Sequence, residues 1–578
     1  MRKLLRRFLA PYRAKIIFGI SCKIVEVIFD LVTPLIVASM IDVGVGGRDT
    51  SYVIRSGLTL VLFAAVGYSF TLICQKMAAL VAQGAGTDMR NALMDKVMFF
   101  SAAEMDRFGA PSLVTRTTND VNQVQVAIAM GIRQLIRFPF IALGSVIAAC
   151  LIDLKLGVVF LVCVPAITAV FSFVTSRSIP FFRSMQEKLD QVSNITREAL
   201  SGVRVIRAFR REQCEEARFD KASDELTSIA IDVGRYSALL SPMTFLVMNL
   251  GIVAILWSGA LRIDVGGLSQ GQVMAFVNYM SQTLIAIVYV ANLAILFNRG
   301  TASGQRILEV LETTPTVTDE ENMPLLLAKD APALELNNVS FSYEGASLPS
   351  LEGVSLTLLQ GQTLGIIGGT GSGKSTLAKL LPRLYDASRG EVKVLGHDVR
   401  DYPFEQLRSL VSLVPQKASL VTGTIRSNLT WRDPTAADED LWKALDLAQA
   451  SEFVSKKTGL LDEPVEAGGK NFSGGQRQRL TIARALVKTP ALIVLDDSAS
   501  ALDFKTDARL RRALHGLRGS MTSVIISQRV SAVMQADLIL VLDHGSMVGL
   551  GSHQDLLKTC PLYQEICLSQ LSPEELSA

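Results

Sequence analysis

Long stretches without ionisable side chains restrict the fold of this chain more than any other feature of its sequence. Four stretches in the first half contain no Asp, Glu, Lys or Arg: 56–75, 156–176, 236–261 and 265–298. About 20 mostly apolar residues are enough for a helix to cross a lipid bilayer. Two further apolar stretches, 16–42 and 134–154, carry only a few charges. We therefore expect six transmembrane helices.

Basic residues are distributed unequally between the segments that join these helices. The connections after the first, third and fifth helices are short and contain few Lys or Arg, whereas the N-terminus and residues 179–235 are rich in both. Basic segments stay on the cytoplasmic side of a membrane. We therefore expect both termini in the cytoplasm of a bacterial-type plasma membrane. The long inner segments 83–132 and 179–235 have helical patterning, so they should extend the membrane helices into the cytoplasm.

The overall composition excludes several classes of protein. Hydrophobic residues make up 49% of the 578 residues and charged residues 19%, which excludes a disordered chain. A net charge of +3 gives no reason to expect nucleic acid as a partner. The seven cysteines include no CxxC pair and are interpreted as buried thiols in a reducing compartment.

The pattern changes near the middle of the chain. Residues 1–310 should form the transmembrane domain, and the mixed segment 311–331, which contains two prolines, should be a linker. From residue 332 to 578, short β-rich runs alternate with helical stretches, as in a parallel α/β domain. We expect buried parallel strands at LGIIGG, ALIVLDD and TSVIISQ.

A phosphate-binding motif follows the first of these strands. It comprises Gly368, Gly369, Thr370, Gly371, Ser372, Gly373, Lys374 and Ser375, with Thr376 directly after it. The pattern GxxxxGK[ST] between a strand and a helix is the P-loop, whose backbone N–H groups surround phosphate oxygens. Lys374 should reach the β- and γ-phosphates, and the Ser375 hydroxyl should bind Mg²⁺. A second apolar strand ends in Asp496, which should also hold Mg²⁺, so the chain is a candidate P-loop NTPase.

Further motifs resemble those of the ABC (ATP-binding cassette) ATPases. The segment Ser473, Gly474, Gly475 and Gln476 is similar to the LSGGQ signature, with Phe472 in place of the usual Leu. Gln416 resembles the Q-loop glutamine, a Mg²⁺ ligand; Tyr343 resembles the aromatic residue that stacks on adenine; and residues 500–503 resemble the D-loop. With six preceding helices, the chain resembles a half-transporter of the multidrug-type exporter branch. The implied fold is an all-α membrane domain followed by an α/β P-loop nucleotide-binding domain, with ATP and Mg²⁺ as cofactors.

The resemblance also implies a mechanism and a partner. In this family, ATP on one P-loop is enclosed by the signature motif of a second cassette, and hydrolysis releases the two cassettes. Segments near 110–120 and 202–212 should couple this motion to the membrane helices. The implied activity is ATP-driven export of a hydrophobic or amphipathic substrate, such as a drug, lipid or peptide, across the plasma membrane, and membrane lipid is a further implied partner.

Two positions depart from the family pattern at the reacting phosphate. The residue after the Mg²⁺-binding aspartate is normally Glu but is Asp497 here, and the switch position, normally His, is Gln528. Together with Gln416 these are the candidate catalytic residues. Because both changes affect hydrolysis more than binding, we expect a slow ATP site and a heterodimer with a different half-transporter that has Glu and His. A homodimeric exporter, a lipid flippase and a non-exporting ATP-binding regulatory subunit remain alternatives.

Three charged residues lie within the first expected membrane helix. Lys23, Glu26 and Asp30 are spaced by three and four residues, so they share one helix face. A charge at membrane depth is costly unless it is paired or hydrated. The cluster is either a cation-attracting or proton-sensitive patch in the substrate path, or a structural ion pair with one carboxylate bonded to a neighbouring helix.

Overall fold

The computed structural model describes the chain except for residues 320–322, 329, 499–501 and 572–578. It divides into two compact units. The membrane unit consists of Met1–Met98 and Pro111–Thr313, and the nucleotide unit consists of Phe99–Ala110 and Thr314–Ala578. The segment 99–110, which the sequence placed in the membrane domain, therefore packs with the nucleotide unit.

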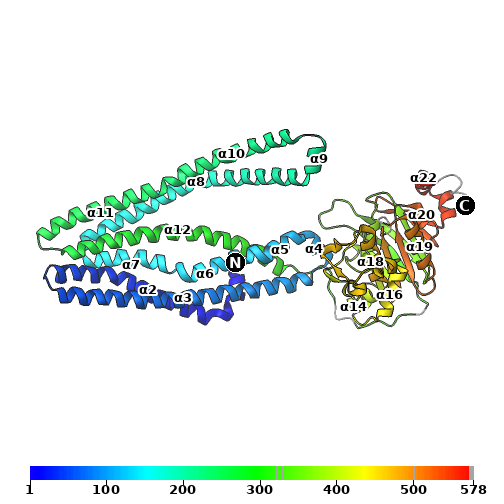
Figure 1. Ribbon diagram of the computed structural model, residues 1–578, viewed down its shortest axis with the longest axis horizontal. Helices are drawn as coiled ribbons and strands as arrows, with labels where there is room; N and C mark the ends of the chain where they lie inside the picture. Colours follow the sequence, from blue (N-terminus) through cyan, green and yellow to red (C-terminus); the bar gives the residue numbers. More distant parts are fainter. Residues whose placement is uncertain (320–322, 329, 499–501, 572–578) are drawn as a thin grey trace. The chain divides into compact units, whose positions relative to one another are not determined.

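The membrane unit is built of helices, and six of its helical segments are long and apolar enough to cross a membrane among the residues described. This confirms the predicted six-helix domain. The helices are α1 (Arg2–Leu9), α2 (Arg13–Ser39), α3 (Thr50–Met98), α5 (Ala110–Thr115), α6 (Val121–Gln134), α7 (Arg137–Ile152), α8 (Leu154–Ser201), α9 (Val203–Ala208), α10 (Glu212–Ala238), α11 (Leu240–Asp264) and α12 (Gln270–Glu312). In Figure 1, α8 and α10 run side by side and are joined by the short α9.

The expected helical extensions are present. Helices α3 and α8 contain 49 and 48 residues. At 1.5 Å per residue each is roughly 70 Å long, more than twice the ~30 Å hydrocarbon thickness of a bilayer. The two differ in one respect: α8 contains Pro165 and Pro180, whereas α3 contains no proline.

The three charged residues of the cluster in α2, Lys23, Glu26 and Asp30, are all paired. Lys23 Nζ lies 2.6 Å from Glu26 Oε2, and both residues are buried. Arg137, at the start of α7, lies 3.5 Å from Glu26 Oε1 and donates to Asp30 Oδ2 at 3.2 Å. This arrangement matches the structural interpretation of the cluster, since the second carboxylate is bonded to a neighbouring helix. The network ties α2 to α7 without leaving either acid uncompensated.

The nucleotide unit contains a ten-stranded sheet in the order β5-β4-β1-β2-β12-β11-β3-β10-β9-β6. Its strands are β1 (Leu334–Phe341), β2 (Leu351–Leu358), β3 (Thr363–Gly368), β4 (Arg389–Val394), β5 (His397–Asp398), β6 (Val411–Val414), β9 (Leu492–Asp496), β10 (Thr522–Ile526), β11 (Leu538–Asp543) and β12 (Ser546–Gly551). The strands β11, β3, β10, β9 and β6 are parallel neighbours. The predicted parallel strands β3, β9 and β10 are thus confirmed, as is the α/β class.

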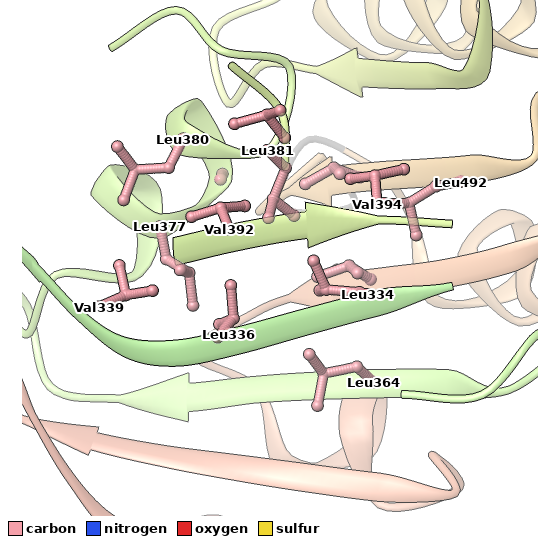
Figure 2. Close-up of a cluster of buried hydrophobic side chains, with 14 of the residues drawn as sticks. Leu334, Leu336, Val339, Leu364, Leu377, Leu380, Leu381, Val392, Val394 and Leu492 are labelled. Carbon is pink, nitrogen blue, oxygen red and sulfur yellow. The ribbon is translucent and has the colours of Figure 1, made fainter. Parts of the chain in front are cut away.

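Helices cover the sheet and enclose its core. They are α13 (Lys374–Leu380), α14 (Phe404–Leu410), α15 (Ile425–Leu429), α16 (Asp438–Leu447), α17 (Ser451–Val454), α18 (Gly474–Leu486), α19 (Phe504–His515), α20 (Val530–Val533), α21 (His553–Thr559) and α22 (Pro561–Gln570). Figure 2 shows leucines of α13, such as Leu377, close to Leu336 of β1 and Val392 of β4. This apolar cluster fixes the helix that follows the P-loop against the sheet.

A short helix from the membrane half of the sequence, α4 (Ala102–Phe108), belongs to the nucleotide unit. Glu104 is buried, and its Oε1 accepts a hydrogen bond of 2.9 Å from the backbone N–H of Thr316. Burial raises the pKa of Glu104, but hydrogen bonds from Ser101 and Thr316 outweigh it and hold the pKa below its usual value. The Tyr385 hydroxyl donates to Asp106. The segment 99–110, which directly precedes the predicted coupling segment 110–120, thus belongs to the nucleotide unit.

Candidate ATP-binding site

The loop between β3 and α13 forms the phosphate cradle. Gly373 has a φ of +94°, and a Cβ atom there would lie 2.4 Å from the backbone oxygen of Ser350. Only glycine fits this position without displacing a neighbouring segment. The chain then enters α13, whose N-terminal N–H groups carry partial positive charge toward the loop.

Lys374 is buried beneath this loop. Its Nζ donates to the backbone oxygens of Gly368 at 2.9 Å and Gly369 at 2.5 Å. Burial lowers the pKa of the Lys374 ammonium, while the charges of Asp497 and Asp496 act in the opposite direction. A triphosphate, with several negative charges, would favour the charged lysine strongly, as the predicted phosphate-binding role requires.

The two predicted Mg²⁺ ligands are in contact. The Ser375 hydroxyl donates to Asp496 Oδ1 at 2.9 Å, which places the start of α13 beside the end of β9. Burial raises the pKa of Asp496, the hydrogen bond from Ser375 lowers it, and the neighbouring charge of Asp497 raises it further. A divalent cation between these oxygens would relieve the unfavourable burial of this carboxylate.

Asp497 and Gln416 form the second pair at this edge. Gln416 Nε2 lies 3.3 Å from Asp497 Oδ2, and the backbone N–H of Asp497 donates to the oxygen of Ile526 at 2.9 Å. Asp497 has a φ of +43°, in the left-handed region that Asp enters more readily than most residues. This edge of the sheet thus brings together the carboxylates of Asp496 and Asp497 and the side-chain amide of Gln416.

A cavity of about 390 Å³ connects these groups. Its lining contains most of the predicted site: Tyr343, Thr370, Gly371, Ser372, Gly373, Lys374, Ser375, Thr376, Gln416, Asp496, Asp497 and Gln528, with Ser350, Ile526 and Ser527. Gln528 is exposed and lies in the loop between β10 and α20. The structure therefore brings together residues from five separate segments that the sequence had assigned to one ATP site.

Tyr343 lies at one end of the cavity. Its hydroxyl is 3.2 Å from Thr376 Oγ1, and its ring makes edge-to-face contacts with Phe341 and Tyr385. Lys379 Nζ lies 5.8 Å from the centre of the ring. These contacts hold an aromatic surface at a fixed orientation beside the phosphate loop, which suits stacking on a nucleobase.

The signature segment lies elsewhere in the cassette. Ser473 caps α18: its backbone N–H donates to Gln476 Oε1 at 3.0 Å, and its hydroxyl accepts from the backbone N–H of Gln476 at 3.3 Å. Ser473 and Gly474 are exposed, while Phe472 is buried. Among the described residues that line the cavity, none belongs to this segment. Of the D-loop, 500 and 501 lie outside the described residues, and Asp503 caps α19 through a 3.1 Å bond from Thr506.

The donor set fits Mg-ATP. Mg²⁺ prefers oxygen ligands and is usually held by one or two carboxylates together with the phosphates of its nucleotide. Ser375, Asp496 and Gln416 can supply such ligands, and no cluster of three His, Cys, Asp or Glu side chains suited to a permanent metal occurs among the described residues. When bound, Mg-ATP supplies the phosphoryl group that hydrolysis transfers to water.

Three residues of the cavity, Ser350, Ile526 and Ser527, were not foreseen as site residues from the sequence. Ser350 precedes β2 and approaches Gly373 through its backbone oxygen, so no side-chain motif in the sequence indicates that it belongs to the site. Ser527 precedes the switch residue, and its hydroxyl accepts a 3.0 Å bond from the backbone N–H of Arg529. Its position next to Gln528 was the available signal.

Comparison with known proteins identifies the family. Residues 16–288 match the ABC transporter transmembrane region, and residues 351–500 match the ABC transporter family. An uncharacterized ABC transporter ATP-binding protein of Mycobacterium tuberculosis is 38% identical over 98% of both chains. An ATP-dependent lipid A-core flippase of Vibrio vulnificus is 28% identical over 98% of this chain and 96% of its own.

The fold is also that of a solved structure. A bacterial Atm1-family ABC exporter with ATP bound superposes with a TM-score of 0.75, covers 99% of both chains and shares 22% sequence identity. The chain is therefore a multi-pass membrane protein with an ATPase domain, as its six candidate membrane helices, its P-loop cassette and these relatives show. The chain belongs to the ABC transporter family and combines, in one polypeptide, the membrane region and the cassette of an ABC exporter half-transporter.

Proposed function

We propose that this chain is one half of a heterodimeric ABC exporter, and that its own P-loop binds Mg-ATP but hydrolyses it slowly. The observation that carries the proposal is the composition of the cavity. The P-loop, Tyr343 and the candidate Mg²⁺ ligands line it, whereas the positions that the family uses for Glu and His hold Asp497 and Gln528. A shorter carboxylate moves the water-orienting oxygens back from the phosphate, and an amide carries no positive charge.

The signature segment supports the need for a second cassette. Ser473 and Gly474 are exposed at the start of α18 and are absent from the described lining of the chain's own cavity. They would complete the ATP site of the partner, where Glu and His carry out rapid hydrolysis. A heterodimer with one slow site and one active site satisfies both observations.

The transported compound is proposed to be hydrophobic or amphipathic. The membrane unit presents long apolar helices, and one relative is named as a lipid A-core flippase, which makes a lipid a specific candidate. The basic residues near the N-terminus and in 179–235 support a plasma membrane location with cytoplasmic termini. Segments 102–108 and 203–208 are proposed to couple the cassettes to the membrane helices.

The proposal is tested by purifying the full chain alone and with its co-purifying partner. We expect tight Mg-ATP binding by the chain alone, very slow phosphate release, and rapid turnover by the pair. Transport is measured in proteoliposomes with a fluorescent lipid and with a cationic dye. Rapid hydrolysis by the chain alone would support a homodimer, and ATP binding without any flux by the complete complex would support a regulatory subunit.

A further inference from the structure

The C-terminal helix α22 ends against the loop that carries the switch residue Gln528. Gln570 is the last residue of this helix. Its Nε2 donates to the backbone oxygen of Gln528 at 2.8 Å, and its Oε1 accepts from the backbone N–H of Val530 at 2.9 Å. One side-chain amide therefore bonds to the backbone on both sides of Arg529.

These two bonds restrain the loop together with a bond inside it, in which the backbone N–H of Arg529 donates to the Ser527 hydroxyl at 3.0 Å. Upstream, Ser527 is held by the sheet, because its N–H donates to the oxygen of Ile366 at 3.1 Å. Arg529 places its guanidinium 5.5 Å from the ring centre of Phe504. For Gln528 itself, the bond from Gln570 is the only hydrogen bond present among the described residues. Gln570 therefore bonds to the backbone of a residue whose side chain lines the cavity.

The helix that carries Gln570 is firmly anchored. Tyr563 and Cys567 of α22 are fully buried in an apolar cluster with Val530 and Val533 of α20. The Tyr563 hydroxyl lies 2.8 Å from His553 Nδ1. The end of the helix is therefore fixed relative to the sheet, although the Gln570 side chain itself is exposed. A fixed support with an exposed polar tip can orient a neighbouring loop without contributing to the core.

We propose that Gln570 is a positioning residue of the ATP site, which acts by holding the backbone of Gln528 so that its side chain faces the γ-phosphate. The inference rests on the proposed role of Gln528 at that phosphate. It makes the C-terminal helix part of the machinery that senses whether ATP or ADP is bound. A side-chain amide of this length supplies a donor and an acceptor together, which neither a carboxylate nor an ammonium group does.

The experiment measures equilibrium affinities of the full chain for Mg-ATP and Mg-ADP, together with its partner if the two co-purify. The quantity compared is the ratio of the two affinities, because a contact with the γ-phosphate strengthens ATP binding alone. Gln528→Ala should reduce this ratio about tenfold, as expected for a hydrogen bond to a charged group. Gln570→Ala should reduce it roughly three- to tenfold, with unchanged ADP affinity.

Two further variants separate positioning from general structure. Gln570→Glu keeps the size and the acceptor for Val530 but cannot donate to Gln528, so it should lower the ratio as much as Gln570→Ala. Gln564→Ala is the matched control, since Gln564 is an exposed glutamine of the same helix with no side-chain bond among the described residues. It should leave the ratio unchanged.

A double variant decides whether Gln570 acts through Gln528. In the Gln528→Ala background, the further change Gln570→Ala should have no additional effect. Additive effects, or a normal ratio in Gln570→Ala while Gln528→Ala is impaired, would overturn the positioning role and leave the proposed ATP site intact. A normal ratio in Gln528→Ala would remove the proposed role of Gln528, and the inference with it.

Discussion

Lengthening one side chain should accelerate ATP hydrolysis by this protein. In Asp497→Glu, the added methylene advances the carboxylate by about one C–C bond, roughly 1.5 Å. In the structure, Asp497 lies beside Gln416 in the lining of the cavity of about 390 Å³, and this cavity offers room for a longer side chain. The variant should carry its oxygens to where they can orient the attacking water.

The size of the effect follows from two opposing terms. A misplacement of about 1 Å can cost on the order of 10²-fold in rate, which corresponds to roughly 2.7 kcal/mol of activation free energy. The backbone φ of +43° opposes the gain, because Glu tolerates the left-handed region less well than Asp, by about 1 kcal/mol. The net gain of about 1.7 kcal/mol corresponds to a rate increase of about 20-fold.

The assay is phosphate release by the purified full chain at saturating Mg-ATP. ATP affinity should remain within about twofold, because the residue acts after binding. Asp543→Glu, the same substitution at the end of β11 and outside the cavity lining, serves as the control. If Asp497→Glu bound ATP normally but released phosphate no faster, the short carboxylate would not be the cause of slow hydrolysis, and the geometric reasoning would be refuted.

Three other outcomes are expected. Burial raises the pKa of Asp496, so on acidification this carboxylate should lose the negative charge that binds Mg²⁺ at a higher pH than an ordinary aspartate does, and the Mg²⁺-dependent ATP affinity should fall at that pH. Titrations of ATP affinity with and without Mg²⁺ test this, and an identical pH dependence in the two would contradict it. Arg137→Ala should destabilise the chain by about 2 kcal/mol, which is less than the 3–5 kcal/mol typical of fully buried pairs, because the Arg137 side chain is 31% exposed and Glu26 keeps Lys23 as a partner. An unchanged thermal unfolding midpoint in detergent would show that the ion pair between Arg137 and Glu26 is dispensable. Tyr385→Phe should remove the hydrogen bond to Asp106 and reduce the amount of substrate transported per ATP hydrolysed at least about threefold, without changing nucleotide affinity. An unchanged ratio of transport to hydrolysis would argue against coupling through α4.

The sequence predicts those parts of the site whose residues are contiguous in a motif. The P-loop and the strand ending in Asp496 each combine a hydrophobic run with polar residues at its carboxyl end, and parallel strands bring such ends to one edge. The six membrane helices are equally evident, because bilayer thickness imposes a minimum length on every apolar run.

Other contacts could not be predicted, because they join segments that are distant in the sequence and carry no local pattern. Glu104 and Thr316 are 212 positions apart, and nothing in either neighbourhood indicates their bond. Gln570 is one polar residue at the end of an amphipathic helix, and its contact with Gln528 depends on how α22 packs. Packing of this kind is decided by the whole core rather than by short-range spacing.

The different proline content of the two longest helices gives them different mechanical properties. A helix without proline keeps an unbroken series of backbone hydrogen bonds, so α3 should behave as a stiff rod, in which a tilt of 5° displaces the far end by roughly 6 Å over its ~70 Å length. In α8, Pro165 and Pro180 each remove one such bond and offer a point of bending. Movement of the Met98 end of α3 should therefore reach the other end of the helix undiminished, whereas α8 can absorb part of the same movement by flexing.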